Sequence, residues 1–267
     1  MILIKVLISI IAISFLIFIS ERKPKIGGLL SGLPIGTGII TFFNAIEQGS
    51  KFVVDGLPYA ILGLLSSLFF TIGFYIGGKF FMRISYVNTL IAFTFGISFF
   101  LIIGYSITFF QANILVSSML FLIGVVGSAF FFKSIKENNG TTNRNRSYSS
   151  IVFRVIFVAI LIVIITGIAK FAGPKWAGIL ASFPTVLAPV LMVLCYFHQD
   201  RIYPTVIKNF TFGITTLLIF YITISYTFIN FEIYIGIFIS YLSCFVYLFL
   251  LSATINMMKN HFLKQQT

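Results

Sequence analysis

The sequence has very few charged residues, and acidic residues are the scarcest. Of its 267 residues, only six are Asp or Glu and 18 are Lys or Arg, so that 9% are charged. An average soluble domain has about 25%. Six acidic groups cannot keep a soluble surface of this size polar, whereas a lipid environment requires an apolar exterior. The composition therefore excludes a water-soluble fold.

Metal-binding and nucleophilic residues are also scarce. The two cysteines, Cys195 and Cys244, each lie within an apolar run and form no C-x-x-C pair. Two histidines are too few for a histidine-rich metal site. His198, Asp200 and Arg201 could form a minimal acid–base group, but such a cluster at the end of an apolar run is more typical of an interfacial loop. We therefore predict no enzyme activity, no catalytic residue, no metal and no cofactor.

What the sequence does contain is apolar runs long enough to cross a bilayer. Hydrophobic residues make up 59% of the chain, and the mean hydropathy is +1.08. A membrane-spanning helix needs about 20 such residues. We predict an all-α, polytopic transmembrane helix bundle of about nine spans, of which the second and seventh carry Gly and Pro and could be broken or re-entrant. The runs are 2–19, 27–46, 57–80, 88–110, 114–132, 151–168, 177–197, 206–228 and 231–255.

The basic residues predict how these spans are oriented. Successive loops fall on opposite faces of the membrane, and this rule places fourteen of the 18 Lys and Arg residues on one face. By the positive-inside rule that face is cytoplasmic, which puts the N-terminus outside and the C-terminus inside. A nucleic-acid-binding protein would cluster its basic residues on one patch. The expected partner is therefore the lipid bilayer and not nucleic acid. The sequence leaves open whether the protein forms a homo-oligomer.

A polar segment divides the chain into two membrane halves. Residues 133–150, rich in Asn, Thr, Ser and Arg, form a predicted cytoplasmic linker. The first half, 1–132, has about five spans, and the second, 151–267, has about four.

The two halves are related by an internal repeat with an offset of 150 residues. Residues 24–34 align with 174–184, and five of the eleven pairs are identical, including Pro34 with Pro184. Further along, Gly63 aligns with Gly213. An odd number of spans separates the two copies, so the second copy is inverted in the membrane. Inverted repeats with paired Gly- or Pro-interrupted helices are the architecture of many secondary transporters.

The repeated motif suggests a path for a solute. A proline inside a helix removes a backbone hydrogen bond and frees a carbonyl, which then needs a neighbouring helix, a hydroxyl or water. A substrate could also fill this role. The alternative is that Gly and Pro serve only close helix packing. The candidate substrate-path residues are Pro34, Thr37, Thr41, Asn44, Pro184 and Thr185.

Polar clusters end both interrupted spans. Glu47 and Gln48 close the second, while His198 and Asp200 close the seventh. If the repeat is inverted, these four residues lie at opposite mouths of the protein as candidate gates. The alternative is that they are hydrated in the headgroup region, where a charge costs little.

The two motifs also carry a resemblance to a known family. The segment 173–185, and 24–34 running into Glu47-Gln48-Gly49, resemble uncharacterised bacterial inner-membrane proteins related to the GlpM family. The resemblance implies a two-repeat bacterial inner-membrane protein without an assigned substrate or catalytic residue, and it does not extend to 88–110, 114–132 or 231–255. A looser similarity in fold class is to drug/metabolite transporters, which have inverted five-helix halves, whereas this chain has four predicted spans in its second half.

The function predicted from these features is secondary transport, by a permease-like protein, of an unidentified small solute. The alternative is a non-transporting membrane protein that serves a structural or partner-binding role.

Overall fold

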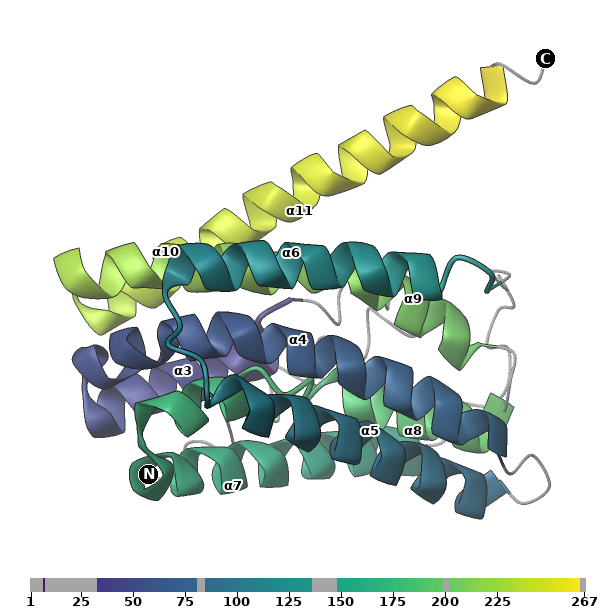
Figure 1. Ribbon diagram of the computed structural model, residues 1–267, viewed down its shortest axis with the longest axis horizontal. Helices are drawn as coiled ribbons and strands as arrows, with labels where there is room; N and C mark the ends of the chain where they lie inside the picture. The colour runs from purple at the N-terminus through teal and green to yellow at the C-terminus, as the bar shows by residue number, and fades with distance from the viewer. Residues whose placement is uncertain (1–6, 8–32, 81–84, 136–147, 199–201, 265–267) are drawn as a thin grey trace.

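The computed structural model is a bundle of α-helices that run roughly along one direction (Figure 1). It describes residues 7, 33–80, 85–135, 148–198 and 202–264. Within these residues there is no strand, which confirms the all-α prediction for this part of the chain. The helices are α3 (Ile35–Gln48), α4 (Ser50–Phe80), α5 (Ser85–Ile107), α6 (Ile114–Phe131), α7 (Tyr148–Ala181), α8 (Leu187–His198), α9 (Tyr203–Gly213), α10 (Thr215–Asn230) and α11 (Ile233–Lys264).

Six helical stretches in the described part of the chain are long and apolar enough to cross a membrane. They are Ser50–Lys79, Ser85–Ile107, Ile114–Phe131, Ile151–Ala181, Tyr203–Asn230 and Ile233–Leu251. Five of them each overlap one predicted span, and Ile151–Ala181 covers 151–168 and the first residues of 177–197. Apart from Leu7, the predicted span 2–19 lies outside the described residues, as does the first part of 27–46. The apolar helices identify the chain as an integral membrane protein.

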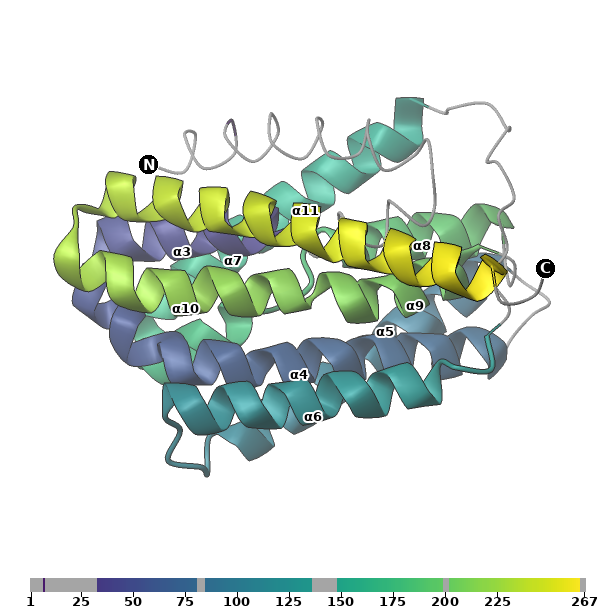
Figure 2. The ribbon, with the colours of Figure 1, turned by 90° about the horizontal axis from the view of Figure 1, so that it is seen from above.

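Helix α4 lies at the centre of the bundle. It packs against α3, α5, α6, α7 and α10, and its Ile61, Leu64 and Phe74 are fully buried. Helices α6 and α11 lie at the periphery, as Figures 1 and 2 show, and large apolar side chains such as Ile123 and Phe249 are exposed there. An exterior of this kind is stable in lipid because apolar side chains lose nothing by facing hydrocarbon.

Close packing between α4 and the last part of α7 depends on small residues. A Cβ atom added to Gly56 would lie 2.6 Å from the carbonyl oxygen of Pro174, and one added to Gly178 would lie 3.0 Å from the backbone nitrogen of Ala60. Gly63 in turn packs against Ser182. The segment from Pro174 onward therefore runs beside α4 in the same direction, and the glycines allow the two backbones to approach.

Helix α7 is two helices joined at a kink. Gly173 has φ 74° and ψ 172°, a conformation that is open to glycine and strained for other residues. Pro174 follows, and because it has no N–H it is suited to the first turn of a new helix. The predicted span 151–168 thus continues to the kink, and the chain then turns back into the bundle toward α8.

Helices α3 and α8 point toward opposite ends of the bundle. Gly49, with φ 93°, joins the end of α3 directly to the start of α4. The end of α8 instead lies beside the start of α5, where the Ser85 hydroxyl donates to the carbonyl of Tyr196. Figure 1 shows the two short helices on either side of the middle of the bundle.

Candidate functional site

The starts of α3 and α8 meet inside the bundle. Gly36, in the first turn of α3, lies directly against Thr185, which precedes α8. A Cβ atom added to Gly36 would overlap the Thr185 hydroxyl and lie 3.2 Å from the Thr185 Cβ atom. Two half-length helices of opposite direction therefore begin at one place, which is also the place where the repeated Pro34 and Pro184 lie.

The start of α3 at Pro34, which we call the first break, is stabilised by hydrogen bonds to one carbonyl. Pro34 is the N-cap of α3, and its carbonyl oxygen accepts from the backbone N–H of Gly38 at 2.6 Å. The same oxygen accepts from the hydroxyl of Tyr241, on α11, at 2.8 Å.

The second break lies between Ala181, where α7 ends, and Leu187, where α8 begins. The predicted span 177–197 is therefore a broken helix. The carbonyl of Pro184 accepts from the N–H of Ala188 at 2.9 Å, while that of Ser182 accepts from the hydroxyl of Ser67 on α4. Hydroxyls of neighbouring helices therefore donate to one carbonyl at each break, that of Pro34 and that of Ser182. The carbonyl of Leu180, four residues before Pro184, accepts from the N–H of Phe183 at 3.1 Å.

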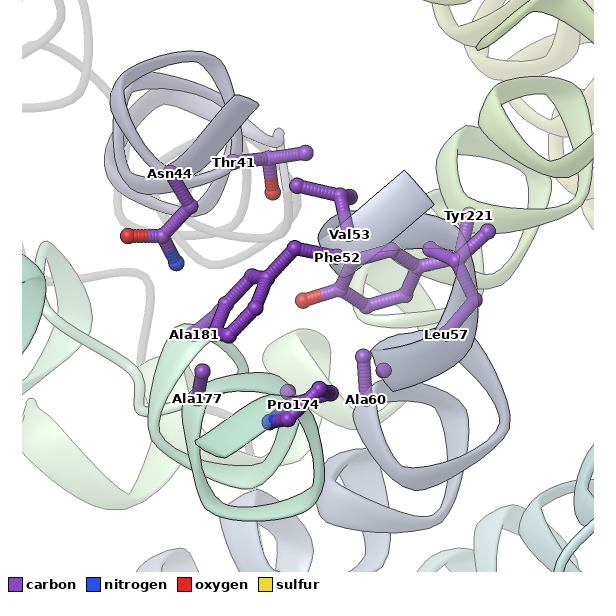
Figure 3. A pocket seen from close by; sticks show the side chains of 12 residues that line it. Thr41, Asn44, Phe52, Val53, Leu57, Ala60, Pro174, Ala177, Ala181 and Tyr221 are labelled. Carbon is purple, nitrogen blue, oxygen red and sulfur yellow. The ribbon is translucent and has the colours of Figure 1, made fainter. Parts of the chain in front are cut away.

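A small cavity lies between α3, α4, α7 and α10, about two to three turns along α3 from Pro34 (Figure 3). About 20 Å³ of it is open to the centre of a water molecule, which is room for about one water. Figure 3 shows Thr41 and Asn44 reaching it from α3, with Tyr221 reaching it from α10. The lining consists of Thr41, Asn44, Phe52, Val53, Gly56, Leu57, Ala60, Pro174, Ala177, Gly178, Ala181 and Tyr221.

Two polar groups at this cavity have no hydrogen-bond partner within the part of the chain that the structure describes. They are the amide oxygen of Asn44, a residue that is 4% exposed, and the hydroxyl of Tyr221, which is 1% exposed. A buried polar atom without a partner costs about 1–3 kcal/mol, and such atoms in native proteins mark an unseen water, an ion or a functional role. The cavity is therefore a place where a polar molecule would be stabilised.

The lining contains no ionisable carboxylate, amine, guanidinium or imidazole. No cluster of His, Cys, Asp or Glu that could hold a metal occurs among the described residues. Of the side chains that the structure describes, Arg154 is the only charged one that is buried, and it does not line the cavity. The site offers neutral hydrogen-bond donors and acceptors next to aromatic and aliphatic groups.

The structure brings together part of the predicted substrate path. Thr37, Thr41, Asn44, Pro184 and Thr185 are all buried. Of the six predicted residues, Thr41 and Asn44 reach the cavity, whereas the two prolines and Thr185 form the adjoining breaks. Thr37 lies in the first turn of α3 between them.

The predicted gates lie where α3 and α8 end, at opposite ends of the described bundle. Glu47 is exposed and Gln48 is half-buried at the end of α3. His198 is the last residue of α8, and Asp200 lies outside the described residues. Their placement fits both the gate hypothesis and the alternative of hydrated headgroup residues.

Sequence reasoning did not single out three side chains of this region, namely Tyr221, Tyr241 and Ser67. Each lies within an apolar run, where hydroxyl-bearing residues are common and carry no periodic or motif signal. The offset of 150 residues could not find Tyr241 or Ser67 either, because it aligns Tyr241 with Ile91 and Ser67 with Leu217.

Comparison of the chain with protein-family models, with curated proteins and with solved structures gives no match.

Proposed function

We propose that this protein is a secondary transporter of a small solute, with nine spans in two inverted repeats. The observation that carries the proposal is the meeting of two oppositely directed half-helices beside a cavity with unpartnered polar groups. Discontinuous helices at a repeat interface are where such transporters bind their substrates.

The bounds of the helices support the repeat. With the offset of 150 residues, α3 aligns with 185–198 and α8 covers Leu187–His198. Likewise α4 aligns with 200–230, where α9 and α10 cover Tyr203–Asn230. Helix α5 aligns with 235–257, which lies within α11. Three consecutive helices of the first half thus align with helical segments of the second, α4 with two consecutive helices and α5 with part of the longer α11.

The proposed location is the bacterial inner membrane, with the N-terminus outside and the C-terminus in the cytoplasm. The charge distribution and the resemblance to proteins related to the GlpM family support this orientation and location.

The cavity represents an occluded conformation. Since it admits about one water molecule, a larger solute enters only when the two breaks move apart. The same small volume favours the second candidate function, a non-transporting membrane protein in which the breaks serve packing alone.

Cysteine accessibility separates the two candidates. In a chain with Cys195 and Cys244 replaced by Ala, single cysteines are placed in turn at the breaks and the cavity, and a membrane-impermeant thiol reagent is added to each side of the membrane in separate reactions. The exposed Lys51 and Lys133 provide positive controls, and the lipid-facing Ile160 provides a negative control. The tested positions are Thr37, Thr41, Asn44, Thr185 and Ala188.

Transport predicts that positions along the breaks are labelled, because a water-filled path reaches them in part of the population. If all five positions stay unlabelled while the Lys51 and Lys133 controls react, the transporter proposal is wrong. The second candidate, a non-transporting membrane protein in which the breaks serve helix packing, would then be the better supported function.

A further inference from the structure

The first turn of α3 is held between two other helices, and each of its glycines marks one contact. Gly36 lies against Thr185 before α8, and Gly38 lies against the phenol ring of Tyr241 on α11. A Cβ atom added to Gly38 would overlap the Tyr241 hydroxyl and lie 2.8 Å from the ring carbon that carries it. The sequence Gly-x-Gly in this turn is thus explained by the space that Thr185 and Tyr241 occupy.

We propose that Tyr241 is a positioning residue for the transport cycle, which fixes the start of α3 in the occluded conformation. Its hydroxyl donates to the Pro34 carbonyl at 2.8 Å, across 207 residues of sequence. Its ring packs against Phe220 with the ring centroids 5.6 Å apart, so the phenol is fixed at both ends. This inference rests on the proposed transport function.

The hydrogen bond between Tyr241 and Pro34 affects the cavity because it holds the helix that carries two of the cavity residues. The acceptor of the Tyr241 hydroxyl, the Pro34 carbonyl, is at the N-cap of α3. The cavity residues Thr41 and Asn44 lie on the same helix, within its first three turns. A helix of this length moves as one body, because each backbone hydrogen bond within it resists bending. Loss of the Tyr241 bond therefore allows Thr41 and Asn44 to move together.

The bond has no counterpart in the other half. In the 150-residue register, the position of Tyr241 on α11 corresponds to Ile91 on α5, which has no hydroxyl. The second break is held instead by Ser67, on α4. Helix α11 follows the part of the chain that the family resemblance covers, so this contact gives the last predicted span a role in the site.

The test is the labelling rate of a cysteine inside the cavity. Ala177→Cys, in the chain with Cys195→Ala and Cys244→Ala, is reacted with N-ethylmaleimide in liposomes, alone and together with Tyr241→Phe. The matched control is Tyr247→Phe, on the same helix, whose hydroxyl donates to Thr215 Oγ1 at 2.8 Å, away from both breaks.

Tyr241→Phe is expected to raise the labelling rate roughly two- to tenfold, the population change that one lost hydrogen bond produces. Tyr247→Phe is expected to leave it unchanged. Gly38→Ala places a methyl group where the Tyr241 hydroxyl lies, so it should displace the phenol and raise the labelling rate as well. This variant therefore tests the positioning role if Tyr241→Phe does not fold.

Three results would overturn the inference. If the Ala177→Cys chain is labelled but neither Tyr241→Phe nor Gly38→Ala changes the rate, the positioning role is wrong while transport stands. If Tyr247→Phe raises the labelling rate as much as Tyr241→Phe does, the loss of any hydrogen bond of α11 has the same effect, and the specific role of Tyr241 is wrong. If no variant is labelled, the transport proposal fails and the role of Tyr241 fails with it.

Discussion

Gly167 and Gly178 lie on either side of the kink in α7, and of the two only Gly178 lies where an added Cβ atom would meet another helix. The surroundings of Gly167 leave open space for a Cβ atom, whereas a Cβ on Gly178 would overlap the backbone of α4 at Gly56. Gly178→Ala should therefore destabilise the protein by about 1–3 kcal/mol through overpacking. Gly167→Ala should be neutral or should stabilise it by up to about 1 kcal/mol through helix propensity. Thermal unfolding in detergent measures both, and equal effects would contradict the α4–α7 contact.

The hydroxyl of Tyr221 is expected to serve function more than stability. Tyr221→Phe removes a hydroxyl that has no partner among the described residues, so the free energy of unfolding should be unchanged or higher by up to about 1–3 kcal/mol. The comparison is Tyr59→Phe, which removes a hydrogen bond to the Phe110 carbonyl at 3.2 Å and should cost about 1 kcal/mol. A loss of stability from Tyr221→Phe above that from Tyr59→Phe would show that its hydroxyl is a structural group and not a substrate contact.

At the scale of the helix, the second break depends on one hydroxyl of α4. The Ser67 hydroxyl donates to the Ser182 carbonyl, while the neighbouring Ser66 hydroxyl is buried without a partner. Ser67→Ala leaves a buried carbonyl unsatisfied and should destabilise the protein by about 1–3 kcal/mol, whereas Ser66→Ala should be neutral or slightly stabilising. Chemical unfolding of the two variants in parallel makes this comparison. If Ser66→Ala is the more damaging of the two, this explanation of the break is wrong.

The breaks themselves could be predicted from the sequence, and their partners could not. Pro34 and Pro184 each carry the physical reason for an interruption, because proline cannot donate a backbone hydrogen bond. Which hydroxyls donate to the carbonyls of Pro34 and Ser182 depends on which helices pack alongside. Ser67 lies 115 residues before its acceptor, and Tyr241 lies 207 residues after its own. No local pattern encodes such a pairing.

On the scale of the whole molecule, composition was the most reliable guide. The shortage of acidic residues and the length of the apolar runs predicted a membrane-spanning α-helical chain, and six long apolar helices confirm that class. The cavity could not be predicted from composition or from the apolar runs. Its size depends on how Phe52 and Tyr221 fill the space beside Asn44, which is a matter of side-chain packing between three helices.

The central claim is that the two helix breaks meet in the occluded protein and part when the cavity opens. Gly36→Cys combined with Thr185→Cys tests it, because the Cβ positions are 3.2 Å apart and a disulfide needs about 3.5–4.5 Å, within reach of a small shift. The two halves are then cut within 133–150, in the chain with Cys195→Ala and Cys244→Ala.

After mild oxidation, the double variant should keep its two fragments linked, while each single variant releases them. Oxidation should also abolish labelling of a third cysteine at Ala177, since the locked breaks keep the cavity closed. Fragments that separate after oxidation would contradict the meeting of the breaks. Linked fragments with undiminished labelling at Ala177 would contradict their role in opening the cavity.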